Sequence, residues 1–131
     1  MQFESNIANG IRASDGGSIC YVSSAESAEQ THHISFRYNQ FFNNSGTVGG
    51  LFYAEPFSMV TADSQLEWIG NNCTNNTAQS GGVLSFSDYL SSVISQYNLY
   101  VDNSATQRGA VMDLGFAAGS NGAIEFRGDQ F

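Results

Sequence analysis

A spaced set of asparagine, aromatic and glycine residues recurs along this chain and narrows the folds that it can adopt. Counting from a first asparagine, an aromatic residue or cysteine lies at position +2 and a second asparagine at +5. A pair of residues containing glycine begins at +10. A small residue lies two positions after the second asparagine. The three copies are Asn39, Phe41, Asn44, Gly46, Gly49 and Gly50; Asn71, Cys73, Asn76, Ala78, Gly81 and Gly82; and Asn98, Tyr100, Asn103, Ala105, Arg108 and Gly109. Because the spacing is shared, we expect equivalent residues to stack in a repeating structure.

A less regular copy opens the chain. Phe3 and Asn6 keep the three-residue step from the aromatic position to the second asparagine, and Ala8 keeps the small position. The glycine pair then follows after ten residues instead of five, which predicts a loop insertion within residues 9–15. The chain closes with Phe131 in the aromatic position, so the sequence opens and closes at the same phase. We therefore expect a fragment of a longer array, or a unit that continues into another unit.

Composition favours strands over helices in a single domain of residues 1–131. Charged residues make up only 12% of the chain, far below the usual quarter, and asparagine, serine and glycine fill the difference. No long stretch has the 3.6-residue apolar period of a helix. Short apolar or alternating segments predict strands at 18–22, 34–36 and 51–54 and at the equivalents of the last two in later copies. The intervening segments 23–33, 55–65, 87–92 and 115–122 are expected to be loops.

About three short strands per copy predict an all-β fold, a parallel β-helix (solenoid) of about four turns. Hydrogen-bonded strands lie about 4.8 Å apart, so each position of the repeat becomes a column of like residues. One internal column is expected to hold Phe3, Phe41, Cys73, Tyr100 and Phe131, and a second Ile34, Leu66, Val93 and Ile124.

Asparagine and glycine are expected to shape the turns. Asparagine tolerates left-handed backbone angles, and stacked amides can hydrogen-bond along the axis. We expect one ladder of Asn6, Asn44, Asn76 and Asn103, and another of Asn39, Asn71 and Asn98 continued by Asp129. Glycine supplies angles that other residues resist, and the turn glycines are Gly16, Gly17, Gly49, Gly50, Gly81, Gly82 and Gly109.

The pairing of Phe-x-x-Asn with Gly-Gly-x resembles the repeat of chlamydial polymorphic outer membrane proteins, which also occurs in other bacterial and protist surface proteins. Phe3-x-x-Asn6, Phe41-x-x-Asn44, Gly49-Gly50-Leu51 and Gly81-Gly82-Val83 match it, whereas Cys73, Tyr100 and Arg108 depart from it. The resemblance covers nearly the whole chain. It implies a right-handed β-helix, located outside the cell or on its surface, with an adhesive or structural role. The barrel and signal sequence of that family are not found in this sequence.

The acidic balance of the chain excludes two classes of partner. The net charge is −8, and Lys and Arg together number only four. Nucleic-acid binding needs clustered basic residues, and an anionic membrane surface attracts them. No apolar run approaches the length of a membrane span, and the first residues lack the pattern of a signal peptide. The chain is thus expected to be cytosolic, mature, or a piece of something longer.

Side chains that could carry chemistry are few and scattered. Cys20 and Cys73 occupy different columns, so we expect two buried thiols and no disulfide. His32-His33 lies near Glu26 and Glu29 without further ligands for a metal. The acids Asp63, Asp88 and Asp113 and the four arginines Arg12, Arg37, Arg108 and Arg127 have no spacing that forces them together. We expect no cofactor, no metal and no enzymatic activity.

Two kinds of short motif remain. Asn-x-Ser/Thr sequons occur at Asn43, Asn72 and Asn75, which are candidate glycosylation sites in a secreted protein. Asn43 and Asn75 each precede a ladder asparagine and are expected to point outward. The integrin-type tripeptide Arg127-Gly128-Asp129 is expected to be a chance match that serves a turn.

Three functions fit these observations. The first is a non-enzymatic structural or adhesive β-helix module outside the cell, whose partners are copies of itself, neighbouring repeats, glycans or cell-surface receptors. The second is a carbohydrate-active β-helix enzyme, favoured by a groove with two carboxylates and an arginine. The third is a glycan-binding module with aromatic platforms at Tyr53, Trp68 or Tyr89.

Overall fold

Short strands make up the regular structure of the chain. A computed structural model describes residues 1–22, 33–55, 64–86, 92–114 and 123–131. The predicted loop segments fall mostly outside these residues. Within them the chain forms strands and no helix, and the strands are β1 (Gln2–Glu4), β2 (Ile7–Asn9), β3 (Cys20–Val22), β4 (His33–Arg37), β5 (Gln40–Phe42), β6 (Phe52–Ala54), β7 (Gln65–Ile69), β8 (Asn72–Thr74), β9 (Thr77–Ser80), β10 (Leu84–Phe86), β11 (Ser92–Gln96), β12 (Leu99–Val101), β13 (Ser104–Arg108), β14 (Met112–Leu114) and β15 (Ala123–Arg127).

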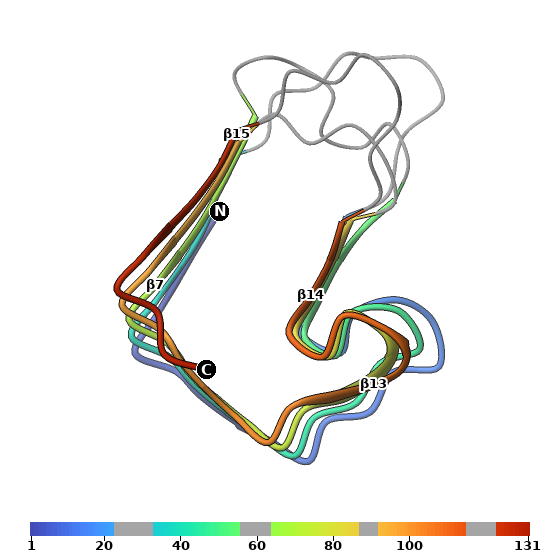
Figure 1. Cartoon of the computed structure of the whole chain (residues 1–131). Helices are drawn as coiled ribbons and strands as arrows, with labels where there is room; N and C mark the ends of the chain where they lie inside the picture. Colours follow the sequence, from blue (N-terminus) through green and yellow to red (C-terminus); the bar gives the residue numbers. More distant parts are fainter. Residues whose placement is uncertain (23–32, 56–63, 87–91, 115–122) are drawn as a thin grey trace.

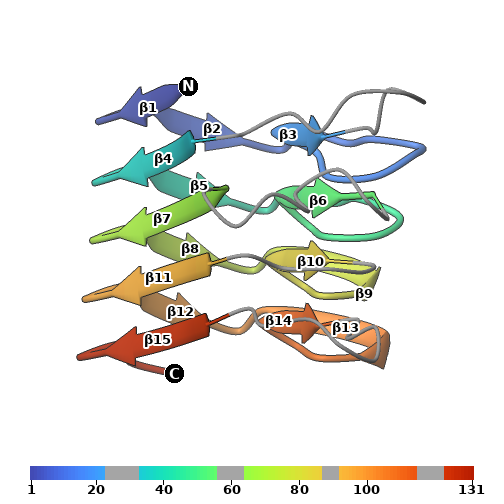
Figure 2. The ribbon, with the colours of Figure 1, turned by 90° about the horizontal axis from the view of Figure 1, so that it is seen from above.

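All the strand pairs are parallel and form open sheets. Their orders are β1-β4-β7-β11-β15, β14-β10-β6-β3, β12-β8-β5-β2 and β13-β9. Each sheet thus takes one strand from each successive stretch of chain. We call these stretches layers: β1–β3, β4–β6, β7–β10, β11–β14, and finally β15 with residues 128–131. Figure 2 shows the layers stacked in sequence order, and Figure 1 looks along the stack, where equivalent strands superimpose. The predicted all-β fold with parallel strands is confirmed.

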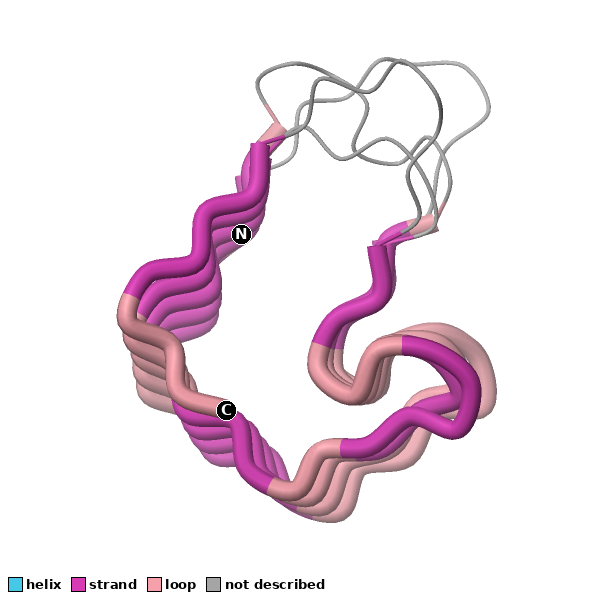
Figure 3. Tube along the Cα trace, in the orientation of Figure 1, coloured by secondary structure: helices cyan, strands magenta, loops and turns pink. Residues whose placement is uncertain are grey.

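Alternation along the strands places the core inside the stack. In β4 and β7 every second residue is buried, because successive side chains of a strand point to opposite faces. Ile34 pairs with Leu66, Leu66 with Val93, and Val93 with Ile124, so the predicted aliphatic column is present. The largest fully buried side chains include Trp68, Phe36, Phe41 and Phe52. Figure 3 shows the short loops recurring at the same corners of each layer.

The aromatic column is present from the second layer onward. Phe41 pairs with Cys73, and Cys73 with Tyr100, and all three side chains are buried. Leu99 forms a bridge with Gln130, and the ring of Phe131 stacks on Tyr100 with centroids 5.3 Å apart. Phe131 itself remains 77% exposed, because it lies in the last layer.

The predicted register of the first copy was wrong. Phe3 pairs with Phe36, not Phe41, and it is Ala8 that pairs with Phe41. Asn6 likewise lies beside Asn39 and not beside Asn44. The sequence Phe36-x-x-Asn39 has the same three-residue step as Phe41-x-x-Asn44. Phe3-x-x-Asn6 can therefore be aligned with either motif, and the two alignments differ by five residues.

The correct alignment reduces the predicted insertion within residues 9–15 to a single residue. The backbone N–H of Ile11 donates to the side-chain oxygen of Asn44 at 3.0 Å, so Ile11 takes the asparagine position of the first layer. Arg12 then forms a bridge with Ser45. On the other side of the turn, the N–H groups of Ile19 and Cys20 donate to Leu51, as those of Leu51 and Phe52 donate to Val83. Gly17-Ser18 therefore corresponds to Gly49-Gly50 and follows Ile11 after six residues.

One further alignment differs in the fourth layer. The N–H groups of Gly81 and Gly82 donate to the carbonyls of Arg108 and Gly109, as those of Gly49 and Gly50 donate to Ser80 and Gly81. The glycine pair thus corresponds to Gly109-Ala110, one residue later than predicted from Arg108-Gly109. Strand β13 absorbs the extra residue in a register shift between Ala105 and Arg108.

Two distinct constraints explain the glycine pairs. The first glycine has a left-handed backbone, with φ of 72° at Gly49, 61° at Gly81 and 59° at Gly109. The second lies against the next layer: a β-carbon at Gly50 would lie 1.9 Å from the carbonyl oxygen of Gly82. In the first layer Gly17 takes the first position of the pair, and the positive φ, of 69°, belongs to Gly16 one residue earlier.

Candidate functional site: asparagine ladders and the exposed faces of the stack

The first asparagine ladder runs through every layer at the corner between the five-stranded sheet and the β2-containing sheet. Asn71 donates its side-chain N–H to the side-chain oxygen of Asn98, and Asn39 donates to Asn71. Backbone N–H groups of Asn39 and Asn71 donate to the same oxygens at 3.0 and 2.8 Å. The second amide hydrogen of each residue reaches a carbonyl of the preceding layer, such as Phe36 O. The buried amides are therefore fully satisfied.

A second ladder lies at the next corner. Asn44 donates to Asn76, and Asn76 to Asn103, each at 3.0 Å between side-chain atoms. Their second amide hydrogens reach the carbonyls of Ala8 and Phe41. The structure thus brings together Asn44, Asn76 and Asn103, the three later members of the predicted ladder. The fourth predicted member, Asn6, belongs instead to the first ladder, where it donates to Asn39.

The left-handed residues are not the ladder asparagines, as the sequence had suggested, but the residues directly before them. Before the first ladder these are Ser5, Tyr38, Gly70, Tyr97 and Gly128, and before the second Gly10, Asn43, Asn75 and Asp102, all with φ between 51° and 72°. Each of these corners, where the chain passes from a strand of one sheet to a strand of another, has one such residue. The following asparagine then fixes the corner through its ladder contacts.

Asp129 is the last member of the first ladder, and one of its carboxylate oxygens lacks a hydrogen bond. Its Oδ1 accepts hydrogen bonds from the backbone and side chain of Asn98, at 2.7 and 2.8 Å. Its Oδ2 is buried and has no hydrogen-bond partner among the described residues. An asparagine would place an amide donor there, whereas a carboxylate oxygen has no hydrogen to give.

The integrin-type tripeptide is built into this corner. Arg127 ends β15, Gly128 has the left-handed φ of 67°, and the Asp129 carboxylate is turned into the ladder. The arrangement assigns these residues to a turn of the stack.

The sequon asparagines occupy different environments. Asn43 and Asn75 are exposed and lie in neighbouring layers, since the N–H of Asn43 donates to the carbonyl of Thr74. Asn72 is half-buried and its Oδ1 accepts a hydrogen bond from Thr74 at 2.9 Å. Accessibility to a bulky glycan is therefore greatest at Asn43 and Asn75.

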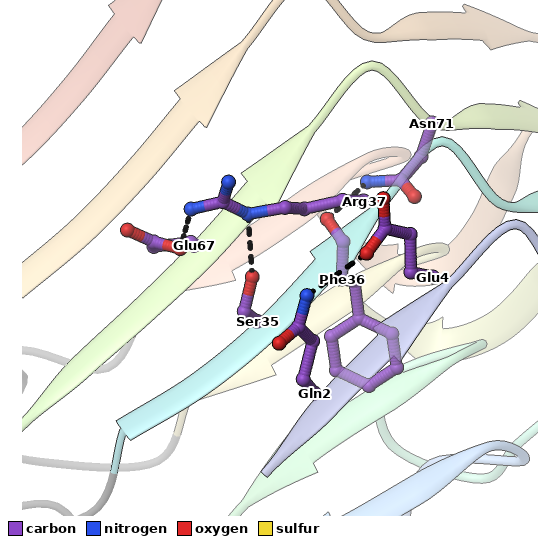
Figure 4. Close-up of polar contacts among 7 residues, drawn as sticks. All are labelled: Gln2, Glu4, Ser35, Phe36, Arg37, Glu67 and Asn71. Carbon is purple, nitrogen blue, oxygen red and sulfur yellow. Dashed lines mark hydrogen bonds and ion pairs between the residues drawn. The ribbon is translucent and has the colours of Figure 1, made fainter.

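The outer face of the five-stranded sheet carries a polar cluster, shown in Figure 4. The guanidinium of Arg37 donates to Glu67 at 2.6 Å and to Ser35 at 2.9 Å, while Gln2 donates to Glu4 at 2.9 Å. The hydrogen bond from Arg37 holds the pKa of Glu67 below its usual value. A hollow of about 290 Å³ lies beside the cluster, lined in part by Glu67 and by His33.

Exposed aromatic rings lie on two other parts of the surface. Tyr21 and Tyr53 stack with centroids 5.5 Å apart, and the Tyr21 hydroxyl donates to Glu55. Tyr38 and Tyr97 are 59% and 60% exposed at the first ladder corner. The predicted platform Trp68 is fully buried and cannot face a ligand. Sequence reasoning missed Tyr38 and Tyr97, although each directly precedes a ladder asparagine.

The first and last layers present apolar side chains. A hollow of about 190 Å³ in the first layer is lined by Phe3, Ala8, Ile11, Ile19 and their neighbours. Ala8 occupies the position that Phe41 takes in the second layer, so its small side chain leaves space there. In the last layer Phe126 is 48% and Phe131 77% exposed. The outer edges of β1 and β15 have no neighbouring strand among the described residues.

The remaining candidate residues stay apart. Cys20 and Cys73 are free and buried, and burial raises the pKa of both thiols. Asp113 lies 3.4 Å from Arg108. His32, Glu26, Glu29, Asp63, Asp88 and Tyr89 lie outside the described residues.

The described part of the chain lacks two further features. No three side chains of His, Cys, Asp or Glu are grouped there closely enough to hold a metal ion. None of its segments forms a helix of the length and apolarity that crossing a membrane requires.

No protein-family model, curated protein or solved structure matches this chain.

Proposed function

We propose that this chain is a right-handed parallel β-helix of about four turns that serves as a non-enzymatic structural or adhesive module outside the cell. In this proposal its repeat is of the polymorphic outer membrane protein type. The module associates end to end with copies of itself or continues into neighbouring repeats of a longer surface protein.

One observation carries the proposal: both ends of the stack combine open strand edges with exposed apolar side chains. Unpaired edges are templates for another strand. At the first layer the hollow above Ala8 is larger than an apolar cavity of about 150 Å³ that accepts benzene. At the last layer the ring of Phe131 lies in the same column as Ala8 and is mostly exposed. The two ends therefore offer complementary shapes.

Charge at the ends supports head-to-tail contact. Glu4 and Arg127 lie in the same column of the five-stranded sheet, which runs through Arg37, Ile69 and Gln96. A contact of β15 with β1 of a second copy would bring these opposite charges together. Such a contact uses different surfaces on the two copies, so it extends into a filament.

Sedimentation velocity and electron microscopy over a range of protein concentrations test the association. We expect oligomers or fibres that lengthen with concentration, and Phe131→Glu should reduce them by placing a charge in the contact. The matched control is Gln79→Glu, because Gln79 is exposed on β9 in the third layer, between the two ends. A monodisperse monomer at all concentrations would contradict the association. Protease accessibility on intact source cells tests the location.

A carbohydrate-active enzyme is the second candidate, favoured by the two carboxylates Glu4 and Glu67 with Arg37 on one face. A glycosidase needs one carboxylic acid that stays protonated. Arg37 acts in the opposite direction on Glu67, whose pKa it lowers. Assays for new reducing ends on a polysaccharide panel decide between the two, and turnover abolished by Glu67→Gln would favour the enzyme.

A further inference from the structure

We propose that Tyr38 and Tyr97 form a binding site for a neutral, extended β-1,4-linked polysaccharide. The site lies on the side of the stack and does not depend on end-to-end association.

The two rings are held in equivalent positions. A β-carbon at Gly70 would lie 2.6 Å from Cδ1 and 2.8 Å from Cε1 of Tyr38, and one at Gly128 would lie 2.7 and 2.8 Å from the same atoms of Tyr97. Each ring therefore lies across a glycine of the following layer. Because the scaffold repeats from layer to layer, equal contacts mean equal ring orientations.

The spacing of the rings follows from the hydrogen bonds at this corner. The N–H of Tyr38 donates to Ile69, that of Gly70 to Gln96, and that of Tyr97 to Arg127. Tyr38 and Tyr97 are thus two layers apart, about 9.6 Å along the stack. In an extended β-1,4-linked chain every second sugar presents the same face, at a comparable spacing. Two such sugars can stack on the two rings together.

The backbone at both tyrosines points to a role beyond filling the corner. Each has φ of 56°, a conformation that is strained for a bulky side chain and that glycine adopts freely. Glycine does occupy the same corner at positions 70 and 128. Strained residues persist where something else is gained, and exposed aromatic rings gain contact area with a ligand.

Charge limits the ligand class. The net charge of −8 repels acidic polysaccharides. On the strands of the five-stranded sheet the acids Glu4, Glu67 and Glu125 outnumber the arginines Arg37 and Arg127. A neutral polymer of glucose or N-acetylglucosamine avoids this repulsion, and its sugars offer the apolar C–H faces that stack on aromatic rings.

Binding to microcrystalline cellulose and to chitin tests the proposal, with cellohexaose and chitohexaose as soluble probes. We expect wild-type protein to bind a β-1,4-linked polymer, and Tyr38→Ala or Tyr97→Ala to weaken binding about tenfold. The double variant should not bind. Tyr21→Ala is the matched control, because Tyr21 is also an exposed aromatic residue, at 47%, but stacks on Tyr53. It should bind like wild type.

Stability measurements separate binding from a merely structural role. Tyr38→Gly relaxes the left-handed backbone, so it should weaken binding about tenfold, as Tyr38→Ala does, while keeping the unfolding midpoint of wild type. Absence of wild-type binding to both polymers would overturn the proposal, as would an equal loss in Tyr21→Ala or equal binding to α-linked amylose. Failure of end-to-end association leaves these outcomes unchanged.

Discussion

Asn39 and Asn71 are joined by two hydrogen bonds that end on one atom. The backbone N–H and the side-chain N–H of Asn39 both donate to Oδ1 of Asn71, each at 3.0 Å. The same pairing recurs between Asn71 and Asn98. The side-chain oxygen of each ladder asparagine thus accepts two hydrogen bonds from the asparagine of the preceding layer. These bonds link neighbouring layers through the buried amides.

Replacing Asn71 by alanine should therefore be among the most damaging changes in the chain. It removes the acceptor for two buried N–H groups of Asn39 and the donor for the carbonyl of Phe36. Each buried polar group left without a partner costs about 1–3 kcal/mol, so we expect a loss of about 3 kcal/mol or more in unfolding free energy. Urea unfolding followed by circular dichroism measures it.

The neighbouring Asn72→Ala is the control for this prediction. Asn72 is half-buried and its side chain accepts one hydrogen bond, from Thr74 two residues away. We expect a loss below about 1 kcal/mol. Equal losses at positions 71 and 72 would show that the ladder does not hold the layers together.

Asp129→Asn should stabilise the protein. The substitution keeps the acceptor for Asn98 and replaces the unpartnered Oδ2 with an amide donor, as at the equivalent Asn98, which reaches the carbonyl of Trp68. One added buried hydrogen bond contributes about 1 kcal/mol. A higher urea midpoint at neutral pH would agree with this, and an unchanged or lower midpoint would contradict it.

The sequence predicted which residues stack in the middle layers better than it predicted the alignment of the first layer. The pairs Phe41–Cys73 and Cys73–Tyr100 follow from spacing alone, because a residue that returns at a fixed position in each layer must meet its equivalent. The first layer was misaligned because two Phe-x-x-Asn steps lie five residues apart. Only pairing with the neighbouring layer decides between them, and that information is not local to either motif.

The sequence pattern also did not predict which residue at each corner has the left-handed backbone. Asparagine at a turn suggests a left-handed backbone, yet at this corner Tyr38 has positive φ and Asn39 makes the ladder contact. Tolerance of left-handed angles identifies turn regions but not the residue within them. The tyrosine site was missed for the same reason, since nothing local marks a tyrosine as the strained residue.

Gly82→Ala should destabilise the stack through close backbone contact. A β-carbon there would lie 2.0 Å from the carbonyl oxygen of Ala110, and backbone atoms cannot move away without disturbing the sheets. We expect a loss of about 3 kcal/mol. The matched change is Ala110→Gly at the equivalent position of the last full layer, which should cost about 1 kcal/mol or less. Thermal unfolding of both variants compares them, and similar losses would argue against the layer contact.

The buried thiols should make the protein less stable as pH rises into the alkaline range. Burial raises the pKa of Cys20 to about 11 and that of Cys73 further, whereas an unfolded thiol ionises near 8.5. Between these values the unfolded state releases protons that the folded state retains, so the unfolding free energy falls with increasing pH. It is unaffected by these groups below about pH 8.

Urea unfolding of wild type and of Cys73→Ala at several values between pH 7 and pH 10 measures this effect. Burial also raises the pKa of Tyr100, so the informative quantity is the difference in slope between the two proteins. We expect the wild-type curve to fall more steeply above about pH 8.5. Parallel curves would mean that Cys73 reaches solvent in the folded state, and rapid reaction of the native thiol with a disulfide reagent would say the same.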